Sequence, residues 1–314
     1  MRGGVRGWHL TLGLALLVVG GAASLTVGVA DLGAEILLVS RVPRLVAILL
    51  AGAALSVAGL LMQRITQNRF VSPSTSGTVE SAVLGILIAT LLFGQSSLVT
   101  KMGIAILTAI AGTLVFLKLL EHIRHSDPIV VALVGMMFGG VITAITVFIA
   151  FQLDLLQFLD IWTTGSFSGI IQGRYEPLFL VLAVGLAGYV YADRFTVIGM
   201  GEEFAVNLGV AYKRTLYTGL VMVSVMAAVV VVVVGAIPFL GLIIPNVVSL
   251  VLGDNVRTVL PATALTGALF VLLCDVVGRV VRYPYEIPVS TVAGVLGGVI
   301  FIVLILKTAR GATP

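Results

Sequence analysis

Residues 215–252 contain no charged side chain. As one α-helix, at ~1.5 Å per residue, they would extend about 57 Å, whereas the hydrocarbon core of a bilayer is about 30 Å thick. The stretch is therefore expected to fold back on itself. Its corner is expected at residues 235–238, Gly-Ala-Ile-Pro, because proline has no N–H with which to continue a helix. A second proline, Pro245, is expected to break the returning limb again.

The composition extends this argument to the whole chain. Of its 314 residues, 59% are hydrophobic and 10% are charged, whereas soluble domains carry about 25% charged residues. These values favour an all-α, polytopic membrane protein with a single transmembrane domain over residues 1–314. An even number of spans would place both termini on one side. A helix needs about 20 apolar residues to cross a bilayer, and about ten runs qualify, near residues 8–30, 45–63, 77–93, 98–118, 129–151, 177–192, 215–234, 236–252, 259–278 and 289–306.

The basic residues predict which side the termini occupy. With the termini inside, twelve of the 18 Lys and Arg residues are cytoplasmic, which is the bias typical of membrane proteins. The outer arginines have two interpretations. Their long side chains could anchor at the lipid interface, or they could form a basic rim that meets an acidic partner. The outer basic residues are Arg41, Arg44, Lys101, Arg174, Arg279 and Arg282.

The most highly charged interval, residues 193–214, lies between two expected spans on the predicted cytoplasmic side. Residues 202–208 are expected to form a short helix within it. Glu202 and Glu203 stand at its start, where the helix dipole favours acids, and Gly209 is the expected stop. A compact charged helix between two spans favours contact with a soluble partner, and a solvated loop is the alternative.

The sequence does not indicate catalytic chemistry. It has no GxxxxGK[ST] phosphate-binding loop, no nucleophile–base pair and no cluster of metal ligands, so we expect a transport subunit without cofactor or metal, not an enzyme. Asp275 and Arg279 stand four residues apart and are expected to pair on one helix face. Glu80 either caps the third span or faces a water-filled path. The lack of a chain of acids across the bundle weakens the alternative class, a proton- or sodium-coupled transporter.

Several motifs, in a fixed order along the chain, resemble one family. They occupy residues 41–45, 51–55, 59–63, 67–73, 201–209, 239–246, 253–255, 260–261, 275–279 and 286–288. Together they resemble the FecCD family, the permeases of ABC importers for ferric siderophores, haem and cobalamin. Residues 69–73 and 283–288 are most similar to permeases for catecholate siderophores of the petrobactin type. Two positions depart from the family pattern, namely Arg69, where Pro is common, and Asn246, where His is usual.

The resemblance implies a cobalamin-importer-like bundle (a type II ABC importer) that translocates an iron(III)-siderophore across the cytoplasmic membrane; haem and cobalamin are the alternative cargoes. It implies a second FecCD-type permease, two ATPase subunits that hydrolyse the ATP, and an extracytoplasmic binding protein. It suggests that residues 129–151 and 289–306 line the path. It assigns binding-protein docking to Arg41, Arg44 and Arg279. It assigns ATPase coupling to Gly201, Glu202, Glu203, Phe204, Ala205, Leu208 and Gly209.

Overall fold

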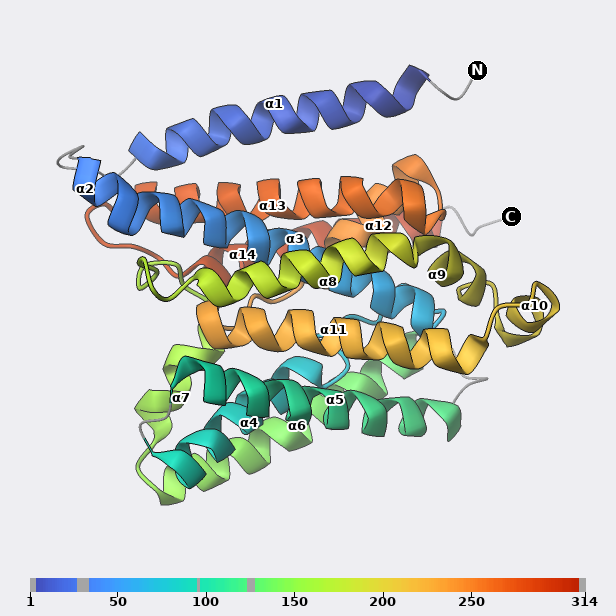
Figure 1. Ribbon diagram of the computed structural model, residues 1–314, viewed down its shortest axis with the longest axis horizontal. Coiled ribbons are helices and arrows are strands. Elements are labelled where there is room, and N and C mark those ends of the chain that lie inside the picture. Colours follow the sequence, from blue (N-terminus) through green and yellow to red (C-terminus); the bar gives the residue numbers. More distant parts are fainter. Residues whose placement is uncertain (1–3, 27–33, 95–96, 123–127, 311–314) are drawn as a thin grey trace.

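The computed structural model describes residues 4–26, 34–94, 97–122 and 128–310, and over these residues it contains helices and connecting turns without a strand. The predicted all-α class is confirmed. Most long helices lie side by side along a common direction (Figure 1). They are α1 (Gly4–Thr26), α3 (Val42–Ile65), α4 (Thr78–Phe93), α5 (Leu98–His122), α6 (Pro128–Gln152), α8 (Phe179–Val190), α11 (Tyr212–Val234), α12 (Leu240–Leu252), α13 (Val256–Val280) and α14 (Val289–Arg310).

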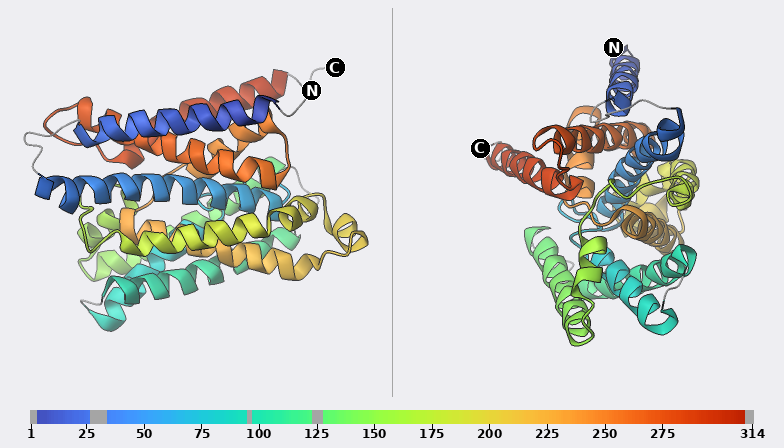
Figure 2. Two further views of the ribbon diagram at one scale, coloured as in Figure 1. Left: turned by 45° about the horizontal axis from the view of Figure 1, so that its top comes forward. Right: turned by 90° about the vertical axis from the view of Figure 1, so that its left-hand side faces the viewer.

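Shorter elements connect these helices at the two ends of the bundle. The start of α1 and the end of α14 lie at the same end as α10, and α2 and α7 lie at the opposite end (Figures 1 and 2). We call these the α10 end and the α7 end. The short elements are α2 (Ala34–Ile36), the π-helix η1 (Leu37–Arg41), α7 (Leu156–Thr163), the 3₁₀ turn η2 (Glu176–Leu178), α9 (Ala192–Ile198) and α10 (Glu202–Asn207).

Each apolar run expected from the sequence contains a helix in the described part of the chain. Among the described residues, five helices are long and apolar enough to cross a membrane: 37–65, α5, α6, α11 and α13. A sixth candidate is the pair formed by residues 176–190 and α9, which is bent by 65°. Shorter apolar helices cover residues 11–26, 78–93, 240–252 and 289–304. A total of ten spans therefore stays a prediction.

The uncharged stretch 215–252 folds back at the corner expected from the sequence. α11 ends at Val234 and α12 begins at Leu240. Gly235 has φ of 95°, and a Cβ there would lie 2.7 Å from the carbonyl oxygen of Thr164, so this position requires glycine. The neighbouring N–H of Ala236 donates to the carbonyl of Trp162 (3.2 Å), which fixes the corner against the residues around α7.

The expectation that Pro245 breaks the returning limb is wrong. α12 continues through Pro245 as one helix from residue 240 to 252. A proline inside a helix disturbs the carbonyls of the preceding turn. Here the carbonyl of Leu242 accepts side-chain hydrogen bonds from Gln63 (3.3 Å) and Asn246 (2.8 Å). Pro245 removes the N–H that would bind the carbonyl of Gly241, four residues earlier; the two side-chain donors bind the next carbonyl along, and the helix is retained.

α3 is largely buried and packs against α11, α12 and α13. Glycines allow its backbone to approach two of these helices closely. A Cβ on Gly59 would overlap the backbone of Gly241 in α12, and a Cβ on Gly52 would lie 2.6 Å from the carbonyl oxygen of Gly267 in α13. The three helices therefore meet backbone to backbone at the centre of the bundle.

Candidate interaction sites at the two ends of the bundle

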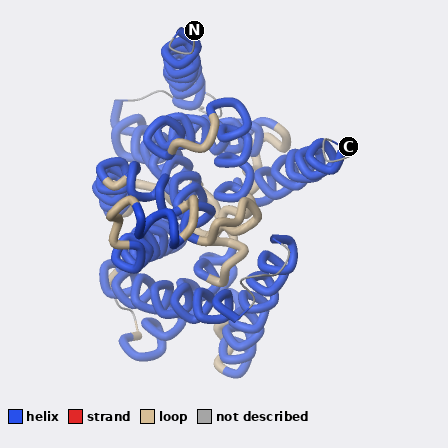
Figure 3. Tube along the Cα trace, turned by 90° about the vertical axis from the view of Figure 1, so that its right-hand side faces the viewer, coloured by secondary structure: helices blue, strands red, loops and turns tan. Residues whose placement is uncertain are grey.

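α10 projects beyond the long helices at one end of the bundle, and Figure 3 views the molecule from this end. Gly201 precedes α10 with φ of 115° and Gly209 follows it with φ of 74°. The N–H of Val210 donates to the carbonyl of Ala205 and that of Gly209 to the carbonyl of Val206, both at 2.9 Å. This pair of bonds is a Schellman motif, which ends a helix at a left-handed glycine. The predicted helix with its stop at Gly209 is confirmed, and it ends one residue earlier than expected.

α10 and the residue after it expose three apolar side chains, together with the polar Glu203 and Asn207. Phe204, Val206 and Leu208 are 61%, 60% and 62% exposed, whereas Ala205 is fully buried and attaches the helix to the bundle. Glu203 is also exposed, in the first turn. Large apolar side chains this exposed, beside polar ones, are typical of a surface that another protein covers. The sequence placed Phe204 and Leu208 here through a resemblance and missed Val206, whose exposure depends on the orientation of the helix.

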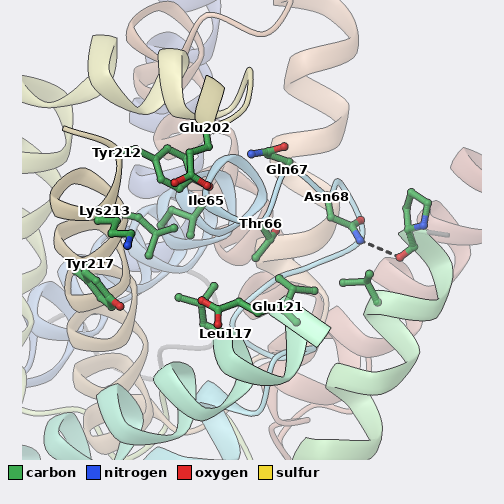
Figure 4. Close-up of a pocket in the computed structure, with 14 residues that line it drawn as sticks. Ile65, Thr66, Gln67, Asn68, Leu117, Glu121, Glu202, Tyr212, Lys213 and Tyr217 are labelled. Atoms are coloured by element: carbon green, nitrogen blue, oxygen red, sulfur yellow. Dashed lines mark hydrogen bonds between the residues drawn. The ribbon is translucent and has the colours of Figure 1, made fainter. Parts of the chain in front are cut away.

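A cavity of about 340 Å³ lies beside α10 at this end, as Figure 4 shows. Its walls come from the ends of α3 and α5 and the starts of α6, α10 and α11. Glu202, Lys213 and Glu121 contribute the charged side chains of its lining. In Figure 4 the carboxylate of Glu202 lies beside Tyr212. The first acid of α10 therefore faces the bundle, and Glu203 belongs to the exposed surface.

A turn after α3 contacts several helices around this cavity. The amide of Gln67 donates to the carbonyl of the last residue of α9 (3.5 Å). The amide of Asn68 donates to the carbonyl of the first residue of α6 (2.9 Å). The ring of Phe70 packs edge-on against Phe301 of α14, with 6.4 Å between ring centroids. This turn thus joins the segment that carries α10 to α6 and α14.

Ionic contacts also connect the loops at the α10 end. Asp254 pairs with Arg64 at 2.9 Å and with Arg69 at 3.0 Å. Partial burial opposes ionisation of Asp254, but the hydrogen bond and charge of Arg64, and then those of Arg69, hold the pKa of its carboxyl below its usual value. The amide of Asn246 donates to the carbonyl of Arg69 (2.8 Å). The two residues that depart from the family pattern are therefore in direct contact.

A cluster of charged residues lies at the opposite end, where α3 begins and α13 ends. The Nη2 of Arg44 donates to Oδ1 of Asp275 (2.8 Å), and its Nη1 donates to Oε1 of Glu286 (2.9 Å). Arg279 forms an ion pair with Oδ2 of Asp275 (2.8 Å) and donates to the hydroxyl (2.6 Å) and the carbonyl (2.9 Å) of Ser24 in α1. We call these five residues the Arg44 cluster.

The Arg44 cluster changes the interpretation of the outer arginines. Arg44 is 9% exposed and Arg279 is 3% exposed, so neither is an open rim residue in this structure. Arg41 is the more exposed of the three arginines. The expected pairing of Asp275 with Arg279 is present. The sequence did not predict that Arg44 pairs with Asp275, because no local spacing connects two residues that are 231 positions apart.

Glu80 faces the interior of the bundle. The residue before α4 is Gly77, and α4 begins without a side-chain cap. The Oε2 of Glu80 is buried with no hydrogen-bond partner among the described residues. Its carboxyl carbon lies 3.3 Å from the position that a Cβ on Gly139 of α6 would take. The carboxyl is thus directed at α6, and the second alternative, contact with a water-filled path, stays a prediction.

The fold is similar to that of a solved metal-chelate type ABC transporter in an inward-facing conformation. The TM-score is 0.81 at 26% sequence identity, and the match covers 95% of this chain and 98% of the other. A helical membrane bundle of this architecture is a multi-pass permease of the cell membrane, with a role in transport. The model of the FecCD transport family matches residues 9–307, and the chain belongs to this family.

Relatives with assigned functions cover nearly the whole chain. The petrobactin import system permease protein YclN of Bacillus subtilis is 46% identical, over 93% of this chain and 96% of the relative. The ferric-anguibactin transport system permease protein FatD of Vibrio anguillarum is 43% identical, over 87% of each chain. The petrobactin import system permease protein FatD of Bacillus anthracis is 40% identical, over 95% of this chain and 91% of the relative.

Proposed function

We propose that this permease is the membrane subunit of an ATP-driven importer for a ferric siderophore of the petrobactin-like, catecholate kind. The observation that carries the mechanism is α10, a short helix with three exposed apolar side chains, flanked by two glycines of positive φ at one end of the bundle. The cargo rests on the relatives, whose assigned substrates include petrobactin and ferric anguibactin. No charge relay crosses the described spans to suggest an ion gradient as the driving force.

ATPase coupling is assigned to α10 and its two flanking glycines. A cytoplasmic ATPase subunit covers Phe204, Val206 and Leu208, with Glu203 at the border of the contact. Ala205 fixes the helix to the bundle, so that the helix moves with its surroundings when the ATPase pair closes on ATP. This assignment places the α10 end, and with it both termini, in the cytoplasm. The turn at residues 67–70 connects that end to α6 and α14.

The assembly contains a second FecCD-type permease, two ATPase subunits and an extracytoplasmic binding protein. The second permease is similar to this chain but distinct from it, and the path lies between the two, along α6 and α14. The binding protein docks at the α7 end. Its acidic side chains meet Arg41 first, because Arg41 is more exposed than Arg44 and Arg279, and then Arg44 and Arg279. Alternating access follows when the two ends open in turn.

The test is uptake by vesicles that contain the purified assembly. Labelled ferric siderophore should enter only when ATPase, ATP and binding protein are all present. Uptake driven by a proton or sodium gradient without the ATPase would refute the mechanism. ATP-driven uptake of haem or cobalamin, with none for ferric siderophores, would refute the cargo and leave the mechanism standing.

A further inference from the structure

We propose that Glu286 is an internal stand-in for an acidic side chain of the binding protein, and that docking displaces it from Arg44 and releases the segment that leads into α14. The inference rests on the proposed docking at the α7 end and goes beyond it. It assigns to this end a carboxylate exchange, in which an external acid replaces an internal one on the same guanidinium.

The geometry of Arg44 identifies Glu286 as the partner that leaves. Arg44 binds two carboxylates at once, Asp275 through Nε and Nη2 and Glu286 through Nη1. The side chain of Asp275 is 3% exposed and is also paired with Arg279, whereas that of Glu286 is 36% exposed. Glu286 can therefore move into water at little cost, and Asp275 cannot.

The exchange keeps the charge on Arg44 compensated. A guanidinium that is 9% exposed is costly to leave without an acceptor, because burial removes the water that would otherwise solvate it. An incoming carboxylate that takes the place of Glu286 restores the contact at Nη1. A neutral acceptor could take the hydrogen bond but would not restore the compensating negative charge. The exchange thus selects an acidic side chain. That side chain must be long enough to replace the 2.9 Å contact between Glu286 and Nη1 of Arg44.

Displacement of Glu286 has a mechanical consequence, because this residue lies between α13 and α14. Residues 281–288 form the connection, and Tyr283 and Tyr285 within it are 68% and 70% exposed. Two polar contacts hold its final part among the described residues: the ion pair of Glu286 with Arg44, and the N–H of Ile287, which donates to the carbonyl of Gly278 (3.0 Å). Loss of the ion pair leaves the backbone contact alone to hold the connection, so docking loosens this segment, while the first turn of α14 stays attached through buried Val289 and through the N–H of Ser290, which donates to the carbonyl of Gly165 (3.1 Å).

The experiment compares Glu286→Gln with wild type and with Asp160→Asn. The control removes one exposed negative charge from α7, at the same end of the bundle and outside the Arg44 cluster. Binding of the binding protein to the full assembly in nanodiscs is measured by biolayer interferometry. A spin label at Tyr285→Cys reports the mobility of the segment. Labelling is selective because Cys274, the one native cysteine, is buried.

We expect Glu286→Gln to tighten binding about fivefold, the effect of removing an internal competitor whose ion pair is partly exposed. Its label should be mobile before the binding protein is added and should change little afterwards. In wild type and Asp160→Asn the label should become mobile only on docking. Glu286→Asp, which keeps the charge but shortens the reach, should behave as Glu286→Gln does. Retained ATPase binding at the other end shows that each variant is folded.

Arg41→Gln separates failure of this inference from failure of the docking proposal. If Arg41→Gln weakens binding while Glu286→Gln changes neither affinity nor label mobility, the exchange is refuted and docking stands. Weaker binding by folded Glu286→Gln also refutes the exchange, because Glu286 then supports docking. If neither Arg41→Gln nor Glu286→Gln has any effect, the docking face itself is wrong, and the inference falls with it.

Discussion

Truncation of Phe204 to alanine should weaken ATPase binding and leave the permease folded. A fully exposed Phe side chain offers ~200 Å², so its 61% exposure leaves about 120 Å² for a partner to cover. At ~25 cal/mol per Å², covering this area contributes about 3 kcal/mol. Alanine retains about a third of that contribution, and the expected loss of ~2 kcal/mol corresponds to about a 30-fold increase in Kd. The folded state loses little, because the side chain is already largely exposed.

The assay is equilibrium binding of the purified ATPase to the permease in nanodiscs, together with thermal melting of the permease alone. Leu186→Ala is the matched control, because Leu186 is also 61% exposed but lies in α8, away from the α10 end. We expect the control to bind ATPase as wild type does and both variants to melt within about a degree of wild type. An unchanged Kd for Phe204→Ala would show that α10 is not the contact and would sink the coupling assignment.

Three other substitutions test the remaining features. Gly59→Ala should cost about 3 kcal/mol and reduce the yield of folded protein, since its methyl group overlaps the backbone of α12, whereas Gly185→Ala, at an open position in α8, should not. The folded-state pKa of Asp254 lies below the ~3.9 of an unfolded chain, so its stabilisation is complete above about pH 4 and is lost as the pH falls further. Melting in detergent from pH 7 to 3 should therefore decline more steeply below pH 4 in wild type than in Asp254→Asn, and parallel curves would contradict this. Glu203→Lys reverses a charge in the first turn of α10 and should weaken ATPase binding several-fold in low salt, with the difference shrinking as salt is added.

The elements that the sequence predicted correctly have local signals. The corner at residues 235–238 combines a glycine with a proline after an apolar run that is too long for one span. α10 has acids at its start and a glycine at its end, and both signals act within one or two turns. The pairing of Asp275 with Arg279 follows from helical spacing alone. In each case the residues that decide the structure are neighbours along the chain.

The features that the sequence missed depend on contacts between distant segments. The burial of Arg44 requires Asp275 and Glu286, which lie more than 200 residues away. Charges near the ends of apolar runs are usually exposed, so the sequence indicated either anchoring at the lipid interface or a basic rim. Pro245 stays inside α12, and in the turn before it the carbonyl of Leu242 accepts from Gln63 of α3, a side chain that no local pattern connects to this helix. The exposure of the apolar side chains of α10 could not be predicted from local patterns either, because it depends on which side of the helix faces the bundle.

The backbone crossings of α3 with α12 and α13 restrict how the permease can change shape. Where side chains separate two helices, a change of rotamer can absorb a small displacement; at Gly59 and Gly52 no side chain is present to do so. These three helices should therefore travel as one rigid block, and sliding between helices should be confined to contacts made by larger side chains, such as Phe70 on α14. The conformational change during transport is then a rotation of the other helices about this rigid block, with the glycine crossings as its fixed point.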